Sequence, residues 1–171
     1  MSFKEHRKKA PKKLRLSVLV VSDTRFAAMA KNRDEDVSGK LIVHHAREAG
    51  HAATRFIVPD DRTKILRSVR GFAADQKIDA VILTGGTGVS KRDVTIETVG
   101  PLFEKKLLGF GEILRRVGYD MVGTPALLTR ASAGIIKRKP FFCLPGAPNA
   151  VEIAMGLILP DLGHVVKHAR G

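Results

Sequence analysis

The sequence predicts a three-layer α/β protein with a doubly wound, mostly parallel sheet and helices on both faces. Over the first half of the chain, short apolar runs rich in β-branched residues alternate with longer segments that have helical spacing. This alternation is typical of parallel strands joined by right-handed helical crossovers. A length of 171 residues with 44% hydrophobic content also allows one compact core that buries about two-thirds of the unfolded surface.

The first strands and helices are predicted from the apolar pattern. Residues 16–21 form a continuous apolar run, which favours a strand covered on both faces. Residues 38–49 have helical spacing, and Gly50 follows where a helix C-cap favours glycine. The alternation continues with a strand, a helix and a strand at residues 52–58, 62–74 and 80–83.

The second half of the chain is less regular, but it contains one hairpin candidate. Apolar runs at 132–136 and 140–144 flank the basic turn Lys137-Arg138-Lys139. The other predicted elements are a short helix near Thr95, a turn at 109–112 leading into a helix at 113–117, a helical stretch near Ala126, and helices after residue 149.

A glycine-rich loop, Thr84-Gly85-Gly86-Thr87-Gly88, directly follows the third predicted strand. Glycines let the backbone N–H groups approach an anion closely, so the loop is a candidate phosphate cradle. It is not a Walker loop, because Gly88 is followed by Val89-Ser90-Lys91, and Lys91 also occupies the position of the third glycine of a dinucleotide fingerprint. The alternative is a tight strand-to-helix turn that binds no ligand.

Acidic residues follow the other two strands of the predicted sheet. Ser22-Asp23-Thr24 comes after the first strand, and Pro59-Asp60-Asp61 after the second. Ligands of doubly wound sheets bind beyond the carboxyl ends of the strands, so these residues should share an edge with the glycine loop. Asp60 and Asp93 are therefore candidate Mg²⁺ ligands. Each is alternatively a helix cap, although Asp61 offers a cap that leaves Asp60 facing the site.

A second glycine turn, Pro145-Gly146-Ala147-Pro148-Asn149, ends the hairpin and precedes a helix. A helix N-terminus favours an anion, so two such turns suit two substrates. The alternative is a rigid turn fixed by its two prolines. Lys91, Arg92 and Arg130 are weaker candidates for neutralising phosphate charge, since isolated surface cations are usually only solvated.

The net charge of +13 is unevenly distributed. Residues 1–13 are expected to be a basic flexible tail, and residues 14–171 a single domain. The tail lacks interleaved aromatic residues, which favours a solvated segment over a nucleic-acid module. The single cysteine excludes an internal disulfide. We expect no membrane span and a cytoplasmic location, because the apolar stretches are short and no signal-like apolar region follows the basic N-terminus.

Four motifs together resemble the MoaB/MogA family of molybdenum cofactor biosynthesis proteins. They are Leu83 to Gly88, Arg92-Asp93-Val94-Thr95, Gly109-Phe110-Gly111-Glu112, and Leu144 to Val151. Their order and spacing are specific to the family, and the resemblance covers residues 16 to about 166. One departure is Ile96, where the family motif usually continues with proline.

The resemblance implies a molybdopterin-binding fold and an enzyme that transfers AMP from Mg-ATP to molybdopterin, with release of pyrophosphate. It places Asp60 and Asp93 at the family's two catalytic, Mg²⁺-binding positions. It further implies that nucleotide or pterin phosphate is bound by Ser22, Asp23, Thr84, Gly85, Gly86, Thr87, Gly88, Ser90, Glu112, Pro145, Gly146, Pro148 and Asn149.

The same resemblance implies self-association as a homotrimer or hexamer, and it leaves open which of the two forms and whether ATP or GTP is preferred. Two alternative functions remain. One is a non-catalytic molybdopterin-binding or scaffold protein of the same fold. The other is a basic nucleic-acid-binding domain, which the net charge of +13 motivates but the tail composition does not favour.

Overall fold

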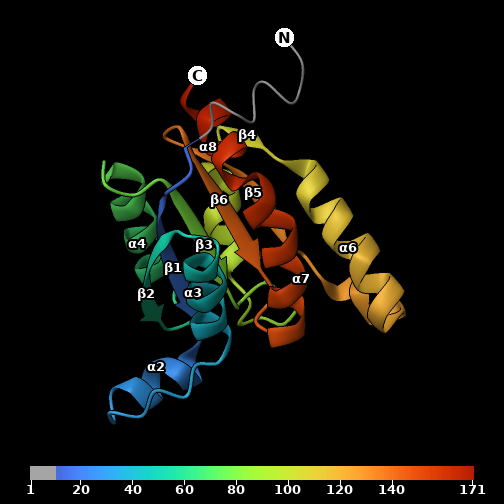
Figure 1. Ribbon diagram of the computed structural model, residues 1–171. Coiled ribbons are helices and arrows are strands. Elements are labelled where there is room, and N and C mark those ends of the chain that lie inside the picture. The colour runs from blue at the N-terminus through green and yellow to red at the C-terminus, as the bar shows by residue number, and fades with distance from the viewer. Residues whose placement is uncertain (1–10) are drawn as a thin grey trace.

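The computed structural model describes residues 11–171 as a six-stranded sheet between two layers of helices (Figure 1). The strand order is β2-β1-β3-β6-β5-β4. β1, β2, β3 and β6 are parallel, and β5 and β4 extend one edge with antiparallel pairing. The predicted mostly parallel sheet is thus confirmed in outline. The strands are β1 (Arg15–Val21), β2 (Ala52–Val58), β3 (Ala80–Thr84), β4 (Lys105–Lys106), β5 (Ser132–Ile136) and β6 (Lys139–Leu144).

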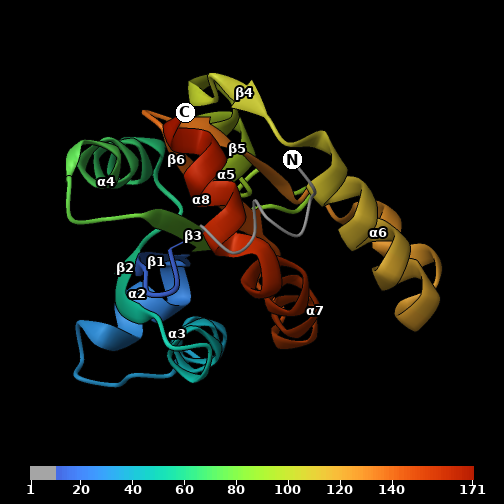
Figure 2. The ribbon, with the colours of Figure 1, turned by 45° about the horizontal axis from the view of Figure 1, so that its top comes forward.

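Helices cover both faces of the sheet, as Figure 2 shows. α3, α7 and α8 pack on one face, α6 lies at the margin of that face beside β5, and α4 and α5 pack on the other face. The α-helices are α2 (Asp23–Met29), α3 (Ser38–Glu48), α4 (Arg62–Ala74), α5 (Thr95–Val99), α6 (Leu108–Val122), α7 (Pro148–Ile158) and α8 (Leu162–Arg170), and the short 3-10 turns are η1 (Gly100–Leu102), η2 (Thr124–Leu128) and η3 (Leu159–Asp161).

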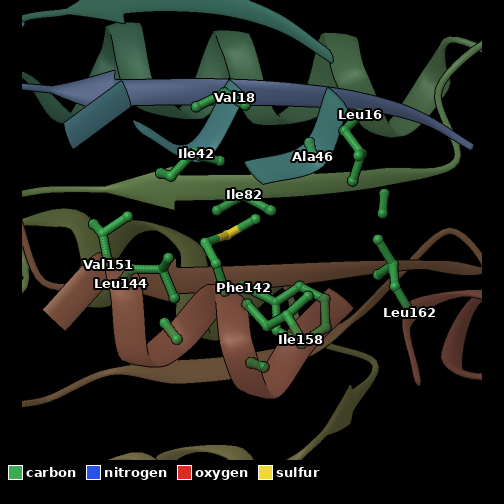
Figure 3. Packing of buried hydrophobic residues seen from close by; sticks show 14 of the residues in the cluster. Leu16, Val18, Ile42, Ala46, Ile82, Phe142, Leu144, Val151, Ile158 and Leu162 are labelled. Carbon is green, nitrogen blue, oxygen red and sulfur yellow. The ribbon is translucent and has the colours of Figure 1, made fainter. Parts of the chain in front are cut away.

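The alternation of side chains along each strand divides the core into two clusters. Val18 and Ile82 point to the face covered by α3 and α7, where they meet Ile42 and Val151 (Figure 3). Leu83, the neighbour of Ile82, points to the opposite face and packs with the helix α4. Because β1 and β3 are buried on both faces, their sequences are mostly apolar and do not alternate with polar residues.

Four elements differ from the sequence-based expectation. The predicted turn at 109–112 is wrong, because these residues lie in the first turns of α6. Gly111 is there for packing, since an added Cβ would lie 2.6 Å from the Ala131 carbonyl oxygen. The 7-residue helix α2 and the 2-residue strand β4 carry no periodic apolar signal and were not predicted. The stretch near Ala126 is a 3-10 turn.

The C-terminal segment Pro148–Arg170 is the one helical run among residues 11–171 that is long and apolar enough, by length and composition alone, to cross a membrane. In the fold its apolar side packs on the sheet as part of the core. Its buried residues are Val151, Ala154, Met155, Ile158, Leu162 and Val166. The segment is therefore a pair of helices that pack in the core of a globular domain.

The predicted basic tail, residues 1–13, lies almost wholly outside the residues that the structure describes. Packing begins at Leu14, which is buried and accepts a hydrogen bond from Ala52 N at 2.8 Å.

Candidate functional site

A pocket of about 380 Å³ opens at the carboxyl ends of β1 and β3. β2 and β3 lie on opposite sides of β1. The connections that follow β1 and β3 therefore run in opposite directions across the sheet. This is the switch point at which doubly wound sheets bind ligands. The predicted residues that line the pocket are Ser22, Asp60, Thr84, Gly85, Gly86, Asp93, Gly146 and Pro148.

The two glycine turns meet at the floor of this pocket. Gly85 and Gly86 have φ values of +96° and +62°, which disfavour any other residue. A Cβ on Gly85 would lie 2.2 Å from the Val21 carbonyl oxygen, so glycine is also required by the close approach of the loop to β1. A Cβ on Gly146 would lie 3.4 Å from Gly85 Cα. The turns are therefore packed backbone against backbone.

Two hydrogen-bond donors of the glycine loop hold the loop itself in place. Gly85 N–H donates to the Leu144 carbonyl at 3.1 Å, and the Thr84 hydroxyl donates to the Pro145 carbonyl at 2.9 Å. Within residues 11–171, the N–H groups of Gly86 and Thr87 have no protein partner, but only Gly86 lines the pocket, because Thr87 is buried. The Gly86 amide, rather than the whole loop, is available to receive an anion.

Asp60 lies at the end of β2 and is held by a reciprocal pair of hydrogen bonds with Asp23. Asp23 N donates to the Asp60 carboxylate at 2.9 Å, and Asp60 N donates to the Asp23 carboxylate at 3.0 Å. Asp61 caps α4 by accepting from Lys64 N at 2.8 Å. Asp61 is thus the cap, and the Asp60 side chain lines the pocket.

Asp93 lies across the pocket, before the helix α5. Its carboxylate accepts from Ser90 N at 2.8 Å and lies against Gly88, where an added Cβ would be 2.8 Å from Oδ2. The N-cap of α5 is Val94, so Asp93 closes the preceding loop instead of capping the helix. Its side chain also lines the pocket.

Arg130 stabilises the loop from outside the pocket. Its guanidinium forms an ion pair with Glu97 of α5, and it donates to the backbone carbonyls of Thr87 at 3.3 Å and Asp93 at 3.4 Å. Arg130 therefore links the two ends of the segment 87–93. Arg92 forms an exposed ion pair with Asp23 at 2.9 Å, a weak interaction at such a surface.

The carboxylates on the two sides of the pocket have opposite pKa shifts. Burial raises the pKa of Asp60; the hydrogen bond from Asp23 N works against this effect, and the negative charges of Asp23 and Asp93 add to it. Burial also opposes ionisation of Asp93, but hydrogen bonds from Ser90 and Gly88 and the charge of Arg130 outweigh it, so the pKa of Asp93 is lowered. Paired groups with opposing shifts are typical of functional sites.

Sequence reasoning missed the segment before α3. Asp36, Val37 and Ser38 line the pocket together with Thr24 and Arg25. The Ser38 hydroxyl donates to the Gly146 carbonyl at 2.7 Å, and buried Asp36 accepts from Gly39 N at 3.0 Å while pairing with Arg55. The signal was available, because Asp36 and Ser38 are small polar residues at the start of a predicted helix, where capping residues are favoured.

Several predicted residues do not line this pocket. Thr87, Gly88 and Ser90 belong to the supporting part of the loop, and Pro145 and Asn149 flank Gly146 and Pro148. Asp23 acts through its bonds to Asp60. Glu112 is an exposed residue of α6. This helix packs beside β5, which is two strands away from β3 in the sheet. The motif around Glu112 is therefore not part of the pocket within one copy of the chain.

The donor set fits a hard divalent cation that shares its ligands with phosphates. Among residues 11–171 there is no group of three or more His, Cys, Asp or Glu side chains that forms a complete metal site. Two carboxylates nevertheless face one pocket, and their mutual repulsion, which contributes to the raised pKa of Asp60, is relieved by a cation. Mg²⁺ is commonly bound in this way, through one or two carboxylates and substrate phosphates.

The fold and the pocket together define a ligand-binding α/β protein with facing carboxylates and two anion-receptive glycine turns. The family model described as "Probable molybdopterin binding domain" matches residues 17–164, and the chain belongs to this family. It is 44% identical over 173 residues to "Molybdenum cofactor biosynthesis protein B" of Bacillus subtilis (strain 168), covering 99% of this chain and 98% of the relative.

Other relatives agree with this assignment. The "Molybdopterin adenylyltransferase" of Pyrococcus furiosus is 41% identical over 174 residues, covering 99% of each chain. Among solved structures, a molybdenum cofactor biosynthesis protein B superposes with a TM-score of 0.86 at 41% identity, covering 94% of this chain and 98% of that one. The tungsten cofactor synthesizing protein MoaB from Pyrococcus furiosus has a TM-score of 0.82 at 41% identity, covering 95% and 100%. The family resemblance inferred from the motifs is confirmed.

Proposed function

We propose that this chain is a cytoplasmic molybdopterin adenylyltransferase that acts in molybdenum cofactor biosynthesis. Family membership and the name of the 41% identical Pyrococcus furiosus relative support the reaction class. The observation that carries the proposal is the pocket, where Asp60 and Asp93 face two touching glycine turns. A two-substrate transfer between phosphates needs two anion-binding elements at one place.

In the proposed reaction, an oxygen of the molybdopterin phosphate attacks the α-phosphorus of ATP. A new P–O bond forms, the bond to the β-phosphate breaks, and pyrophosphate leaves with the electron pair. Catalysis of such steps is mostly positioning and charge stabilisation. The free N–H group of Gly86 is suited to bind a phosphate oxygen, and the N-terminus of α7 beside Gly146 offers the second anion position.

Asp60 and Asp93 would hold Mg²⁺ in this centre, and the metal would offset the charge that develops on the phosphates. Asp23 orients Asp60 through the reciprocal hydrogen bonds, and Ser90 and Gly88 orient Asp93. The test is pyrophosphate release from Mg-ATP in the presence of molybdopterin. A protein that binds molybdopterin but releases no pyrophosphate would instead be the non-catalytic relative.

Replacing Arg130 with Gln should lower kcat about 10- to 100-fold with a smaller change in KM for ATP. The ion pair with Glu97 and the two carbonyl contacts would be weakened, so segment 87–93 would hold Asp93 less firmly. Steady-state pyrophosphate release measures both constants. Arg130→Lys should restore only part of kcat, because an ammonium cannot form the bidentate pair. An Arg130→Gln enzyme with wild-type kcat would contradict this positioning role.

The proposed self-association, as a trimer or hexamer, has a candidate surface on α6 and η2. Figures 1 and 2 both place α6 at the outer side of the molecule. Next to it lies an apolar hollow of about 490 Å³. We name this surface the α6 patch, and its exposed apolar residues are Leu108, Ile113, Tyr119, Met121, Val122, Leu127 and Leu128. Exposed apolar side chains gathered on one helix and the turn that follows it are typical of an interface between subunits.

The double variant Met121→Glu/Leu127→Glu should be a monomer when its mass is measured by light scattering after gel filtration. Both side chains are exposed in one copy, at 63% and 75%, so the free energy of unfolding of that copy should hardly change. Met29→Glu, a similar change on α2, is the control and should leave the oligomer intact. An unchanged mass of the double variant would place the interface elsewhere.

A further inference from the structure

The edge of the sheet opposite the catalytic pocket is strongly basic. There, the amino ends of β1, β3 and β6 meet the end of α8, which Figure 1 shows at the top, with α2 at the bottom. Two hollows of about 650 and 480 Å³ adjoin at this edge and share Arg15, Asp79 and Arg170. The larger one also contains Lys137, Arg138 and Lys139, and the smaller one contains Lys13. Six cations thus surround one carboxylate.

Two of these six cations are already engaged. Arg170 forms an ion pair with Asp79, whose carboxylate also accepts from Arg15 N at 2.6 Å. Lys139 is buried, and its ammonium donates to the carbonyls of Phe72, Ala73 and Asp75 at the end of α4. The side chains of Lys13, Arg15, Lys137 and Arg138 are exposed and have no protein partner within residues 11–171. Four free cations therefore surround a concave, polar space.

The turn that presents two of them has a conformation unusual for its residues. Ile136 pairs with Lys139, so Lys137 and Arg138 form a two-residue hairpin turn, and both have positive φ, +45° and +63°. This is the pattern of a type I′ turn, which strongly favours Asn-Gly. Non-glycine residues in this region carry strain, and such strain is concentrated at functional sites. Fold stability alone does not account for Lys-Arg at this place.

We propose that this edge is a second anion site, which binds the phosphate groups of a small polyphosphate-type ligand. A hollow of 650 Å³ has the size of a small-molecule site. Its cations are guanidinium and ammonium groups, which bind phosphate oxygens by charge-assisted hydrogen bonds. Among residues 11–171, no Phe, Tyr or Trp lines either hollow, and His51 of the smaller one is the single aromatic ring, so neither provides the series of stacking platforms that single-stranded nucleic acid needs. The site is separate from the catalytic pocket and does not depend on the adenylylation proposal.

The test is calorimetric titration of the full-length protein with sodium tripolyphosphate, in EDTA and 150 mM salt. Wild type should bind, and Lys137→Asn/Arg138→Gly should bind at least about tenfold more weakly, because two charged donors are lost. The same double variant should have a Tm about 2–5 °C higher, since Asn-Gly relieves the strain of the turn. Lost binding in a more stable protein cannot be attributed to misfolding.

Lys31→Gln/Arg67→Gln is the charge-matched control, because both residues are exposed and lie outside the two hollows. It should bind tripolyphosphate like wild type. A parallel titration with a 20-base-pair RNA duplex distinguishes a free polyphosphate from a phosphate backbone. The proposal is overturned if the turn variant binds tripolyphosphate like wild type, if the control loses binding equally, if wild type binds none, or if only the duplex binds.

Discussion

Asp93→Asn should lower the rate of pyrophosphate release at least about a thousandfold while the protein keeps its fold. Asn retains an oxygen that accepts the hydrogen bond from Ser90 N, so the loop before α5 should stay closed. What is lost is the negative charge, which the lowered pKa of Asp93 keeps in place at neutral pH. Removing one charged group from a preorganised centre typically costs several kcal/mol of transition-state stabilisation, about a thousandfold or more.

The measurement is steady-state pyrophosphate release with molybdopterin and Mg-ATP, with Tm as the check on folding. Asp75→Asn, at the end of α4, is the matched control and should retain full activity. Asp93→Ala removes the acceptor as well and should reduce activity at least as far. An Asp93→Asn enzyme with wild-type turnover would remove this carboxylate from the catalytic centre, whereas a wild type without turnover would refute the adenylylation proposal itself.

Asp60→Asn should abolish most of the activity and, at neutral pH, make the protein more stable. The raised pKa means that the folded state is penalised for ionising Asp60, through burial and the charges of Asp23 and Asp93. The amide removes this penalty and can still accept the hydrogen bond from Asp23 N. We expect a Tm increase of about 1–3 °C at pH 7, together with a loss of turnover of about a thousandfold.

The stability difference between Asp60→Asn and wild type should depend on pH in a definite direction. A carboxyl group whose folded pKa is raised costs nothing below its unfolded pKa, near the ordinary value of 3.8, where it is protonated in both states. The cost develops as the pH rises through the folded pKa. The Tm difference between Asp60→Asn and wild type should therefore be near zero at pH 3 and largest at neutral pH. Asp61→Asn keeps the cap of α4 and should show neither effect.

The first half of the fold could be predicted from the sequence because each element there has a strong apolar period. The observed bounds of β2 and α4 agree with the predicted ranges 52–58 and 62–74. The short helix α2 could not be found in this way, since it buries only Ala28 and is defined by the Ser22 cap. In α6, two glycines near the N-terminus suggested a turn, but Gly111 permits close packing against the chain before β5.

The candidate site was predictable to the extent that parallel strands place their carboxyl ends together. That rule brought Asp60 and the glycine loop to one pocket. It could not reveal which hydrogen-bonding groups the protein uses itself, and Gly85 N–H proved to be taken by Leu144. Nor could it assign Arg130, whose contacts join residues 87, 93 and 97, because that depends on where the chain before β5 passes.

The backbone contact between Gly85 and Gly146 sets how near two ligands can come. With no side chain between these turns, the partition inside the pocket consists of backbone alone. Two phosphates bound on its two sides would be within reaching distance without any domain closure. Binding alone would then give the two phosphates much of the high effective concentration that two groups have when they are joined covalently in one molecule. A methyl group at Gly146 would lie at ordinary van der Waals distance, 3.4 Å from Gly85 Cα, whereas one at Gly85 would collide with the Val21 carbonyl oxygen and move the loop, and with it the spacing of the two phosphates.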